Sequence, residues 1–158
     1  MVNPKTSAPG NQDMASIEYS TRVCICGGGP AGMMLGMLLS KAGIDVIVLE
    51  KHQDFLRDFR GDTVHPSTLE TFFDLGLLDQ LLARPHDKAQ FISAVFGGKE
   101  FRIADFSRLP THAKFIAFMP QWEFLDFVSQ EAKRSQHFSL LMEAECQGLI
   151  TNQGHVTG

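Results

Sequence analysis

The chain has 158 residues, of which 44% are hydrophobic and 20% are charged, and its formal net charge is −4. This composition is typical of one globular domain rather than of a disordered or fibrous chain. The negative balance and the scattered Lys and Arg residues argue against nucleic acid as a partner. No run approaches the roughly 20 apolar residues of a membrane span.

The first 20 residues are polar and lack the apolar core of a signal peptide. We predict that residues 1–20 are a disordered leader, that residues 21–158 are the ordered domain, and that the protein is cytoplasmic. Three cysteines, Cys24, Cys26 and Cys146, show neither a disulfide framework nor zinc-ligand spacing. On a strand, Cys24 and Cys26 would share one face, and we expect both to be small buried core residues.

The segment 21–50 predicts a strand, a helix and a second strand. Residues 21–26 are typical of a short buried strand. Residues 45–50 are apolar through the middle, as expected for a parallel strand that is covered on both faces. Between the strands, residues 31–42 are rich in helix formers, and Gly43 fits the left-handed position that ends a helix. The segment therefore predicts a βαβ unit of about 30 residues.

A Gly-x-Gly-x-x-Gly motif joins the first strand to the helix. Gly27 permits the tight turn, Gly29 lets a pyrophosphate approach the backbone, and Gly32 allows close packing of the helix on the strand. The phosphates would bind the free N–H groups at the helix N-terminus, where Pro30 lacks an N–H without harm. Glu50 ends the second strand, about 20 residues further on, where a carboxylate can accept hydrogen bonds from ribose hydroxyls. The pattern predicts FAD or NAD rather than NADP, and disfavours a turn that binds no ligand.

The rest of the chain predicts further helices and strands. A helix is expected from Pro66, with Ser67 as its N-cap and Glu70 completing a capping box. Two strands at 90–96 and 100–103, joined through Gly-Gly-Lys, predict a hairpin. Other expected elements are helices at 77–83 and 122–134 and strands at 115–119, 138–142 and 146–151. The predicted fold class is α/β, a parallel nucleotide-binding sheet with helices, crossed by a small antiparallel sheet from the hairpin region.

Three segments together resemble the start of a known enzyme family. They are the run Gly27-Gly28-Gly29-Pro30-Ala31-Gly32, the run Val48-Leu49-Glu50-Lys51, and the run from Arg60 to Glu70. With them, residues 21–158 resemble the FAD-dependent aromatic-ring hydroxylases, the p-hydroxybenzoate hydroxylase-like flavoprotein monooxygenases. The resemblance implies a Rossmann-like FAD-binding domain that is incomplete at its C-terminus, because the family's later motifs are expected beyond Gly158.

The resemblance also implies a set of cofactor-binding residues. The loop Gly27, Gly28, Gly29, Pro30, Ala31 and Gly32 would hold the FAD pyrophosphate. Glu50 would bind the adenosine ribose, with Lys51 beside the adenine. Arg60 matches an arginine that reaches the cofactor phosphates, a task that suits its planar fork. Gln121 matches a glutamine that contacts the cofactor from the start of a helix. The plainer alternatives are a solvated charge at Lys51, a surface residue at Arg60 and an ordinary helix-start residue at Gln121.

The resemblance implies that the chain is the FAD-binding portion of a flavin-dependent oxidoreductase of the monooxygenase type. NAD(P)H would supply electrons, and one oxygen atom of O₂ would go to a small, possibly aromatic, substrate. We assign no catalytic acid or base, and no metal ligand, because the six histidines show no ligand spacing. The alternatives are an NAD-dependent dehydrogenase and a truncated remnant without catalytic activity.

Overall fold

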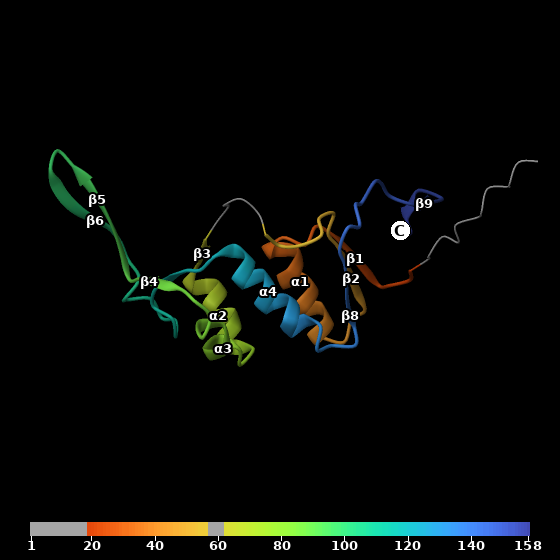
Figure 1. Ribbon diagram of the computed structural model, residues 1–158, viewed down its shortest axis with the longest axis horizontal. Helices are drawn as coiled ribbons and strands as arrows, with labels where there is room; N and C mark the ends of the chain where they lie inside the picture. The colour runs from red at the N-terminus through yellow and green to blue at the C-terminus, as the bar shows by residue number, and fades with distance from the viewer. Residues whose placement is uncertain (1–18, 57–61) are drawn as a thin grey trace, which may run out of the picture.

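The computed structural model describes residues 19–56 and 62–158. Arg60 and nearly all of the predicted leader lie outside the described residues. Figure 1 shows an elongated arrangement, with a parallel sheet towards one end, helices in the middle and a projecting hairpin at the other end. The fold class is mixed α/β, as predicted.

The parallel sheet contains β1 (Val23–Cys26), β2 (Val46–Leu49) and β8 (Phe138–Leu141) in the order β1-β2-β8. All three strands run in the same direction, and their positions agree with the predicted strands. The central strand is apolar, and its residues Val46, Ile47 and Val48 are all buried between the two neighbouring strands and the helices.

Strand β1 has one covered face and one open face. Val23 and Ile25 pack against the core, whereas the alternate residues Cys24 and Cys26 are exposed, as is Cys146. The expectation that Cys24 and Cys26 are buried core residues is therefore wrong. Their shared face was predicted correctly, but it is the face that points away from the helices, and the described residues do not cover it.

Helices α1 (Pro30–Lys41) and α4 (Gln121–Ala132) pack against each other, and α1 also contacts all three strands of the parallel sheet. Met33, Met37 and Val128 are completely buried where the layers meet. Helix α1 ends as predicted, because Gly43 has a φ of +77°. In the part of the chain that the structure describes, no helix is long and apolar enough to cross a bilayer.

Next to α4 lie α2 (Pro66–Asp74) and α3 (Leu78–Leu82), beside a small sheet of β3 (Thr63–Val64), β7 (Ile116–Phe118) and β4 (Asp87–Ala89). The predicted capping box is wrong. The N-cap of α2 is His65, no side chain caps it, and Pro66 takes the first helical position. The Glu70 carboxylate instead accepts the His112 N–H and lies next to the His112 ring.

Strands β5 (Phe91–Phe96) and β6 (Lys99–Asp105) form the predicted hairpin. Gly97 and Gly98 both have positive φ, as a tight two-residue hairpin turn requires. The hairpin projects from the body instead of crossing the parallel sheet, so that part of the prediction is wrong (Figure 1). The sequence pattern correctly predicts that these two strands form a hairpin. It does not predict how the hairpin is oriented relative to the rest of the domain, because a local pattern holds no information on contacts between distant segments.

The expected strand at 146–151 is also wrong. Residues 145–150 have no regular structure, and the chain instead forms a short hairpin of β9 (Thr151–Asn152) and β10 (His155–Val156). Leu149 and Ile150 are about 70% exposed, at 69% and 70%. Within the described residues, only the end of this run finds a backbone partner, since Thr157 and Gly158 donate their N–H groups to the Ile150 carbonyl over 2.8 and 3.2 Å.

Candidate cofactor site

The glycine loop connects the end of β1 to the start of α1. Gly27 donates its N–H to the Leu49 carbonyl over 2.8 Å and has a φ of +109°, which favours glycine. A Cβ at Gly32 would lie 2.0 Å from the Gly27 carbonyl oxygen, so the helix approaches the loop at backbone distance. A Cβ at Gly29 would meet nothing within 4 Å. The loop is therefore tight at its first and third glycines and open at its second.

The N-terminus of α1 is suited to an anion. Gly29 is the N-cap, Pro30 follows it, and no side chain caps the helix or places a negative charge in its first turn. The Met33 N–H makes an intrahelical bond to the Gly29 carbonyl over 2.9 Å. The earlier amides, those of Ala31 and Gly32, have no partner within the helix. These amides and the positive end of the helix dipole can bind phosphate oxygens.

Glu50 is fixed beneath the loop, with only 7% of its surface exposed. Its Oε2 accepts the Gly28 N–H over 2.9 Å, and its Oε1 accepts the His52 N–H over 3.0 Å. The His52 ring Nδ1 also lies 2.5 Å from Oε1. A Cβ at Gly28 would lie 2.9 Å from the Glu50 Cβ. Gly28 must therefore be glycine so that the Glu50 side chain can lie close to the loop backbone. The glycine motif alone did not predict this role.

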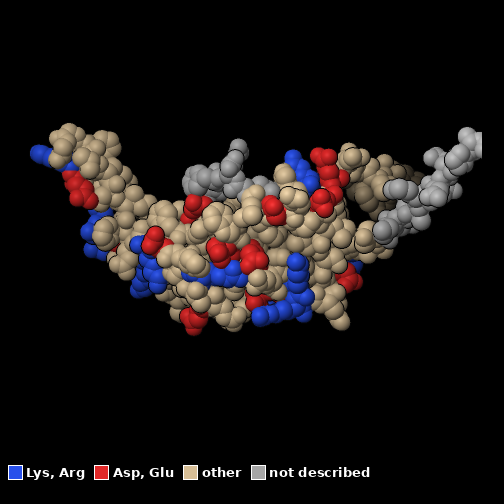
Figure 2. Space-filling view, viewed as in Figure 1, with Lys and Arg blue, Asp and Glu red and all other residues tan. Residues whose placement is uncertain are grey.

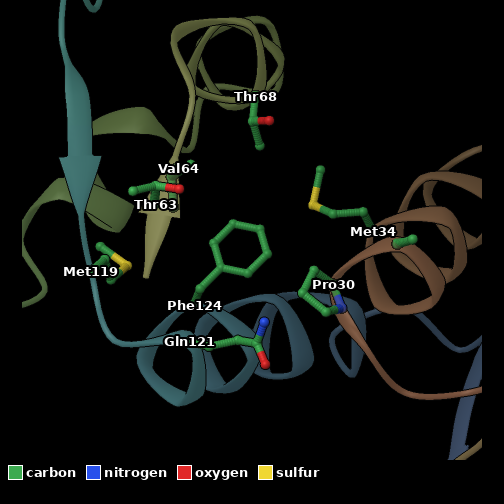
Figure 3. A pocket seen from close by; sticks show the side chains of 9 residues that line it. Pro30, Met34, Thr63, Val64, Thr68, Met119, Gln121 and Phe124 are labelled. Atoms are coloured by element: carbon green, nitrogen blue, oxygen red, sulfur yellow. The ribbon is translucent and has the colours of Figure 1, made fainter. Parts of the chain in front are cut away.

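One pocket, of about 240 Å³, opens beside the start of α1 (Figure 3). Gln121 and Pro30 come from the starts of two different helices and lie on the same side of it. Phe124 and Met119 supply apolar walls, and Thr68 contributes a hydroxyl. The full lining is Pro30, Ala31, Met34, Thr63, Val64, Thr68, Met119, Gln121 and Phe124. The sequence did not predict the two threonines, because they reach the pocket only through the folding of β3 and α2 around it.

A second pocket, of about 350 Å³, lies at the Gly27 end of the loop. Its lining comprises Gly27, Leu49, Glu50, Lys51, His52, Ala144, Glu145 and Cys146. The segment after β8 forms one wall, because the Ala144 N–H donates to the Glu50 carbonyl over 2.9 Å. The two pockets thus border opposite ends of the glycine loop, and an extended ligand could contact both.

The structure brings together nearly all of the predicted site residues. The loop residues Gly27 to Gly32, Glu50, Lys51 and Gln121 all line one of the two pockets or adjoin the loop. Arg60 lies outside the described residues, so its position stays a prediction. Among the residues described, no group of three or more His, Cys, Asp or Glu side chains could hold a metal ion. On the face shown in Figure 2, positive and negative side chains are intermixed rather than gathered in one basic patch.

Residues 20–158 match a family model described as an FAD binding domain. The chain belongs to this family. The match extends over the glycine loop, Glu50 and both pockets, and it confirms the resemblance to FAD-dependent hydroxylases at the level of the family. It also favours FAD over NAD, which the glycine motif could not distinguish by itself.

Individual relatives of this FAD binding domain point to oxygenases. A 6-methylpretetramide 4-monooxygenase from Streptomyces rimosus is 27% identical over 138 residues, which cover 87% of this chain and 33% of that protein. A 3-(3-hydroxy-phenyl)propionate/3-hydroxycinnamic acid hydroxylase from Escherichia coli is 35% identical over 71 residues, 45% of this chain and 12% of that protein. PqsL from P. aeruginosa, solved with 2-aminobenzoylacetate, has a TM-score of 0.75 at 20% identity, covering 86% of this chain and 37% of PqsL.

The PqsL comparison establishes likeness of fold alone, because its sequence identity is low. The chain spans between 12% and 37% of the length of these three proteins.

Proposed function

We propose that residues 21–158 form a Rossmann-like unit that binds the ADP half of FAD and belongs to a flavin-dependent monooxygenase. The observation that carries the proposal is the open space at Gly29, in front of the uncapped start of α1 and beside the anchored Glu50. A dinucleotide needs these three features together: room for a pyrophosphate, donors that face it and a carboxylate for the ribose.

Each residue of the site has a distinct proposed task. The amides of Ala31 and Gly32 donate to the pyrophosphate oxygens. The Glu50 carboxylate accepts from ribose hydroxyls, since each carboxylate oxygen has more than one acceptor position. Lys51 flanks the adenine side of the second pocket, and Gln121 donates its amide N–H to the cofactor chain from the first pocket. The role of Arg60 rests on the resemblance to the family alone.

The bound flavin would supply the redox chemistry, with NAD(P)H as the electron donor and O₂ as the oxygen source. The residues of this chain bind and orient the cofactor. Met34, Met119 and Phe124 give the first pocket an apolar wall that excludes water from one side of it. A small aromatic molecule is the proposed substrate class, supported by the family resemblance and by the phenolic substrate in the name of the E. coli relative.

Titration of the purified chain with FAD tests the proposal, with quenching of flavin fluorescence and the visible flavin band as readouts. We expect one FAD per chain, bound weakly enough to be removed by dialysis, and no comparable binding of NADH. Tight NADH binding without flavin would instead support an NAD-dependent dehydrogenase. Binding of neither ligand by a folded chain would support a remnant without cofactor.

A variant at Gly29 connects the result to the loop. Because a side chain there meets no protein atom, Gly29→Val should fold normally, as judged by circular dichroism, yet fill the space proposed for the pyrophosphate. We expect its FAD affinity to fall about tenfold or more, which corresponds to about 1.4 kcal/mol. Gly148→Ala is the matched control, because its added Cβ also meets nothing within 4 Å and Gly148 lines neither of the two cofactor pockets. Unchanged FAD binding by Gly29→Val would contradict the proposed site.

A further inference from the structure

Two thiols of β1 and a third from near the C-terminal end of the chain meet on the open face of the parallel sheet. Cys24 and Cys26 lie on the uncovered face of β1, and Cys146 follows β8. All three are exposed, and all three line one pocket of about 690 Å³. Strand β1 pairs only with β2 in the described sheet, so no neighbouring strand separates these thiols from the segment around Cys146.

Cys26 and Cys146 lie close together, because both line this pocket and Cys146 is the main influence on the pKa of Cys26. The pKa of the Cys26 thiol is raised to about 11, first because it hydrogen bonds to Cys146, and further because burial and the nearby Cys146 and Cys24 oppose its ionisation. Cys26 therefore keeps its proton at neutral pH. Cys146 also contacts the Gly148 carbonyl oxygen through its Sγ, over 3.7 Å. The described residues contain no metal-binding cluster, so thiol chemistry is the use that this arrangement suits.

We propose that Cys26 and Cys146 form a reversible disulfide, a thiol-redox site that borders the second pocket but uses none of the residues assigned to FAD. The oxidant is a peroxide. In the first step the Cys146 thiolate attacks hydrogen peroxide, which gives a Cys146 sulfenic acid and hydroxide. In the second step the Cys26 thiol attacks that sulfur, the S–S bond forms, and the sulfenic oxygen leaves as water with the thiol proton. Two thiols are oxidised and one peroxide is reduced to water.

The position of this disulfide connects it to the glycine loop. Cys26 immediately precedes Gly27, and Cys146 lines the second pocket together with Gly27 and Glu50. The bond would join the end of β1 to the wall of that pocket and would limit how far the segment after β8 can move. Disulfides of reducing compartments are typically transient and redox-sensing, which fits a site that opens again in the presence of thiols.

The test uses the full chain, reduced first and then treated with hydrogen peroxide, followed by alkylation and mass spectrometry. We expect the oxidised chain to lose two hydrogen atoms and to keep one alkylatable cysteine of its three. Trypsin should yield peptide 23–41 joined to peptide 135–158, and dithiothreitol should restore three alkylatable thiols. Three alkylatable thiols after peroxide, or a cross-link only between separate chains, would overturn the proposal.

Three serine variants identify the pair of thiols. Cys26→Ser and Cys146→Ser should abolish the cross-linked peptide, whereas Cys24→Ser should keep it. Cys24→Ser is the matched control because Cys24 lies on the same face of the same strand, two residues away. A cross-link that persists in Cys26→Ser would assign the bond to Cys24 and overturn the proposal. Peptide 23–41 contains both Cys24 and Cys26, so fragmentation of the cross-linked peptide between these two residues assigns the bond even if a variant fails to fold.

Discussion

Gly36 of α1 lies directly against Phe138 of β8. A Cβ added at Gly36 would be 2.9 Å from the Phe138 Cε2 and 2.8 Å from the Val48 Cγ2. Neither neighbour can move away easily, because Phe138 is 7% exposed and Val48 is completely buried. Gly36 comes one turn after Gly32, so these two glycines together set how closely the loop-bearing helix approaches the sheet.

Replacement of Gly36 by alanine should therefore destabilise the protein by about 1–3 kcal/mol, the usual effect of overpacking a core. This loss would exceed the gain of up to about 1 kcal/mol that alanine brings to a helix interior. Urea unfolding monitored by circular dichroism measures the difference. Gly148→Ala, with no atom within 4 Å of its new Cβ, should change the free energy of unfolding little. Equal stabilities for the two variants would show that α1 can shift on the sheet.

Glu50 connects the stability of the loop to cofactor binding. Its two oxygens accept from Gly28 on one side and from His52 on the other. In Glu50→Gln, one of these positions becomes an NH₂ group, which cannot accept, so either the Gly28 amide or the His52 donors lose their partner. We expect a loss of about 1–3 kcal/mol in the free energy of unfolding. FAD affinity should fall as well, because the ribose loses an acceptor.

Glu145→Gln is the control for this experiment. Glu145 lines the same pocket but is exposed, and the change also removes one negative charge. Urea unfolding and FAD titration of both variants separate a general charge effect from the loss of the specific hydrogen bonds. If Glu145→Gln lowers stability and affinity as much as Glu50→Gln does, Glu50 has no special role in the loop.

The parts of this fold that the sequence predicted are those set by neighbouring residues. The glycine loop, the end of α1 at Gly43 and the hairpin turn at Gly97 each need a particular backbone conformation that few residue types adopt. Other features depend on contacts between distant segments. The exposure of Cys26 follows from which face of β1 the helices cover, and Thr68 reaches the pocket only because α2 borders it on a different side from α1. The hydrophobic periodicity of one segment does not show which of its faces another segment will cover, so it could predict neither the exposure of Cys26 nor the position of Thr68.

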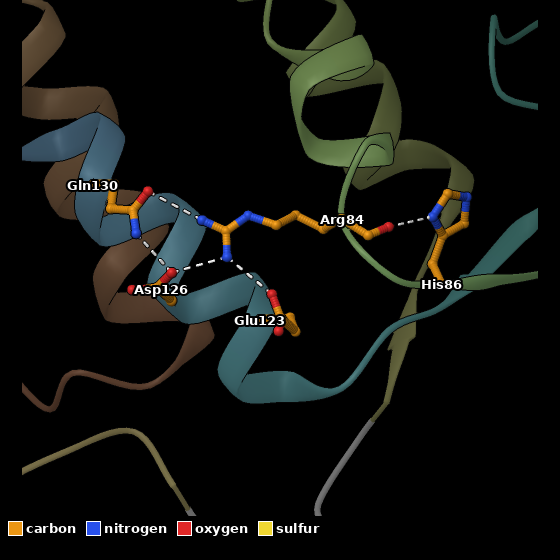
Figure 4. Close-up of polar contacts among 5 residues, drawn as sticks. All are labelled: Arg84, His86, Glu123, Asp126 and Gln130. Atoms are coloured by element: carbon orange, nitrogen blue, oxygen red, sulfur yellow. Dashed lines mark hydrogen bonds and ion pairs between the residues drawn. The ribbon is translucent and has the colours of Figure 1, made fainter.

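Arg84 joins the segment after α3 to α4 (Figure 4). Its Nη1 donates to Glu123 over 2.9 Å and to Asp126 over 2.8 Å, and its Nη2 donates to Gln130 over 3.0 Å. Hydrogen bonds to the two carboxylates raise the pKa of Arg84. Without the guanidinium, two carboxylates would face each other across one helical turn without a shared counter-charge.

We expect Arg84→Ala to lower the free energy of unfolding by about 1–2 kcal/mol, an amount reduced by the partial exposure of the network. Arg84→Lys should recover only part of this loss, because one ammonium group cannot reproduce the planar fork. Urea unfolding at low and high salt measures both changes, and the difference should shrink at high salt. Arg108→Ala, at an exposed turn, is the control. Full recovery by lysine would show that charge alone stabilises this contact.

Glu70 attaches the loop before β7 to helix α2. Its Oε2 accepts the His112 N–H over 2.8 Å, and its Oε1 lies 2.9 Å from the ring Nδ1 of the same residue. The His112 ring also stacks on Phe73, with centroids 3.3 Å apart. The backbone and ring hydrogen bonds from His112 lower the pKa of Glu70 below its ordinary value of 4.5.

This lowered pKa predicts how stability depends on pH. A carboxylate whose pKa is lower in the folded state stabilises the protein above its unfolded-state pKa, and that contribution is lost as the pH falls through the folded-state pKa. At about pH 5.5, above the usual range of a carboxyl pKa, Glu70→Gln should therefore be less stable than the unmodified protein. The difference should shrink steadily below about pH 4.5. Urea unfolding at several acidic pH values measures it, with the exposed Glu100→Gln as control. If the difference in the free energy of unfolding between the two proteins stays constant as the pH falls, the packing of the Glu70 side chain, rather than its charge, stabilises this contact.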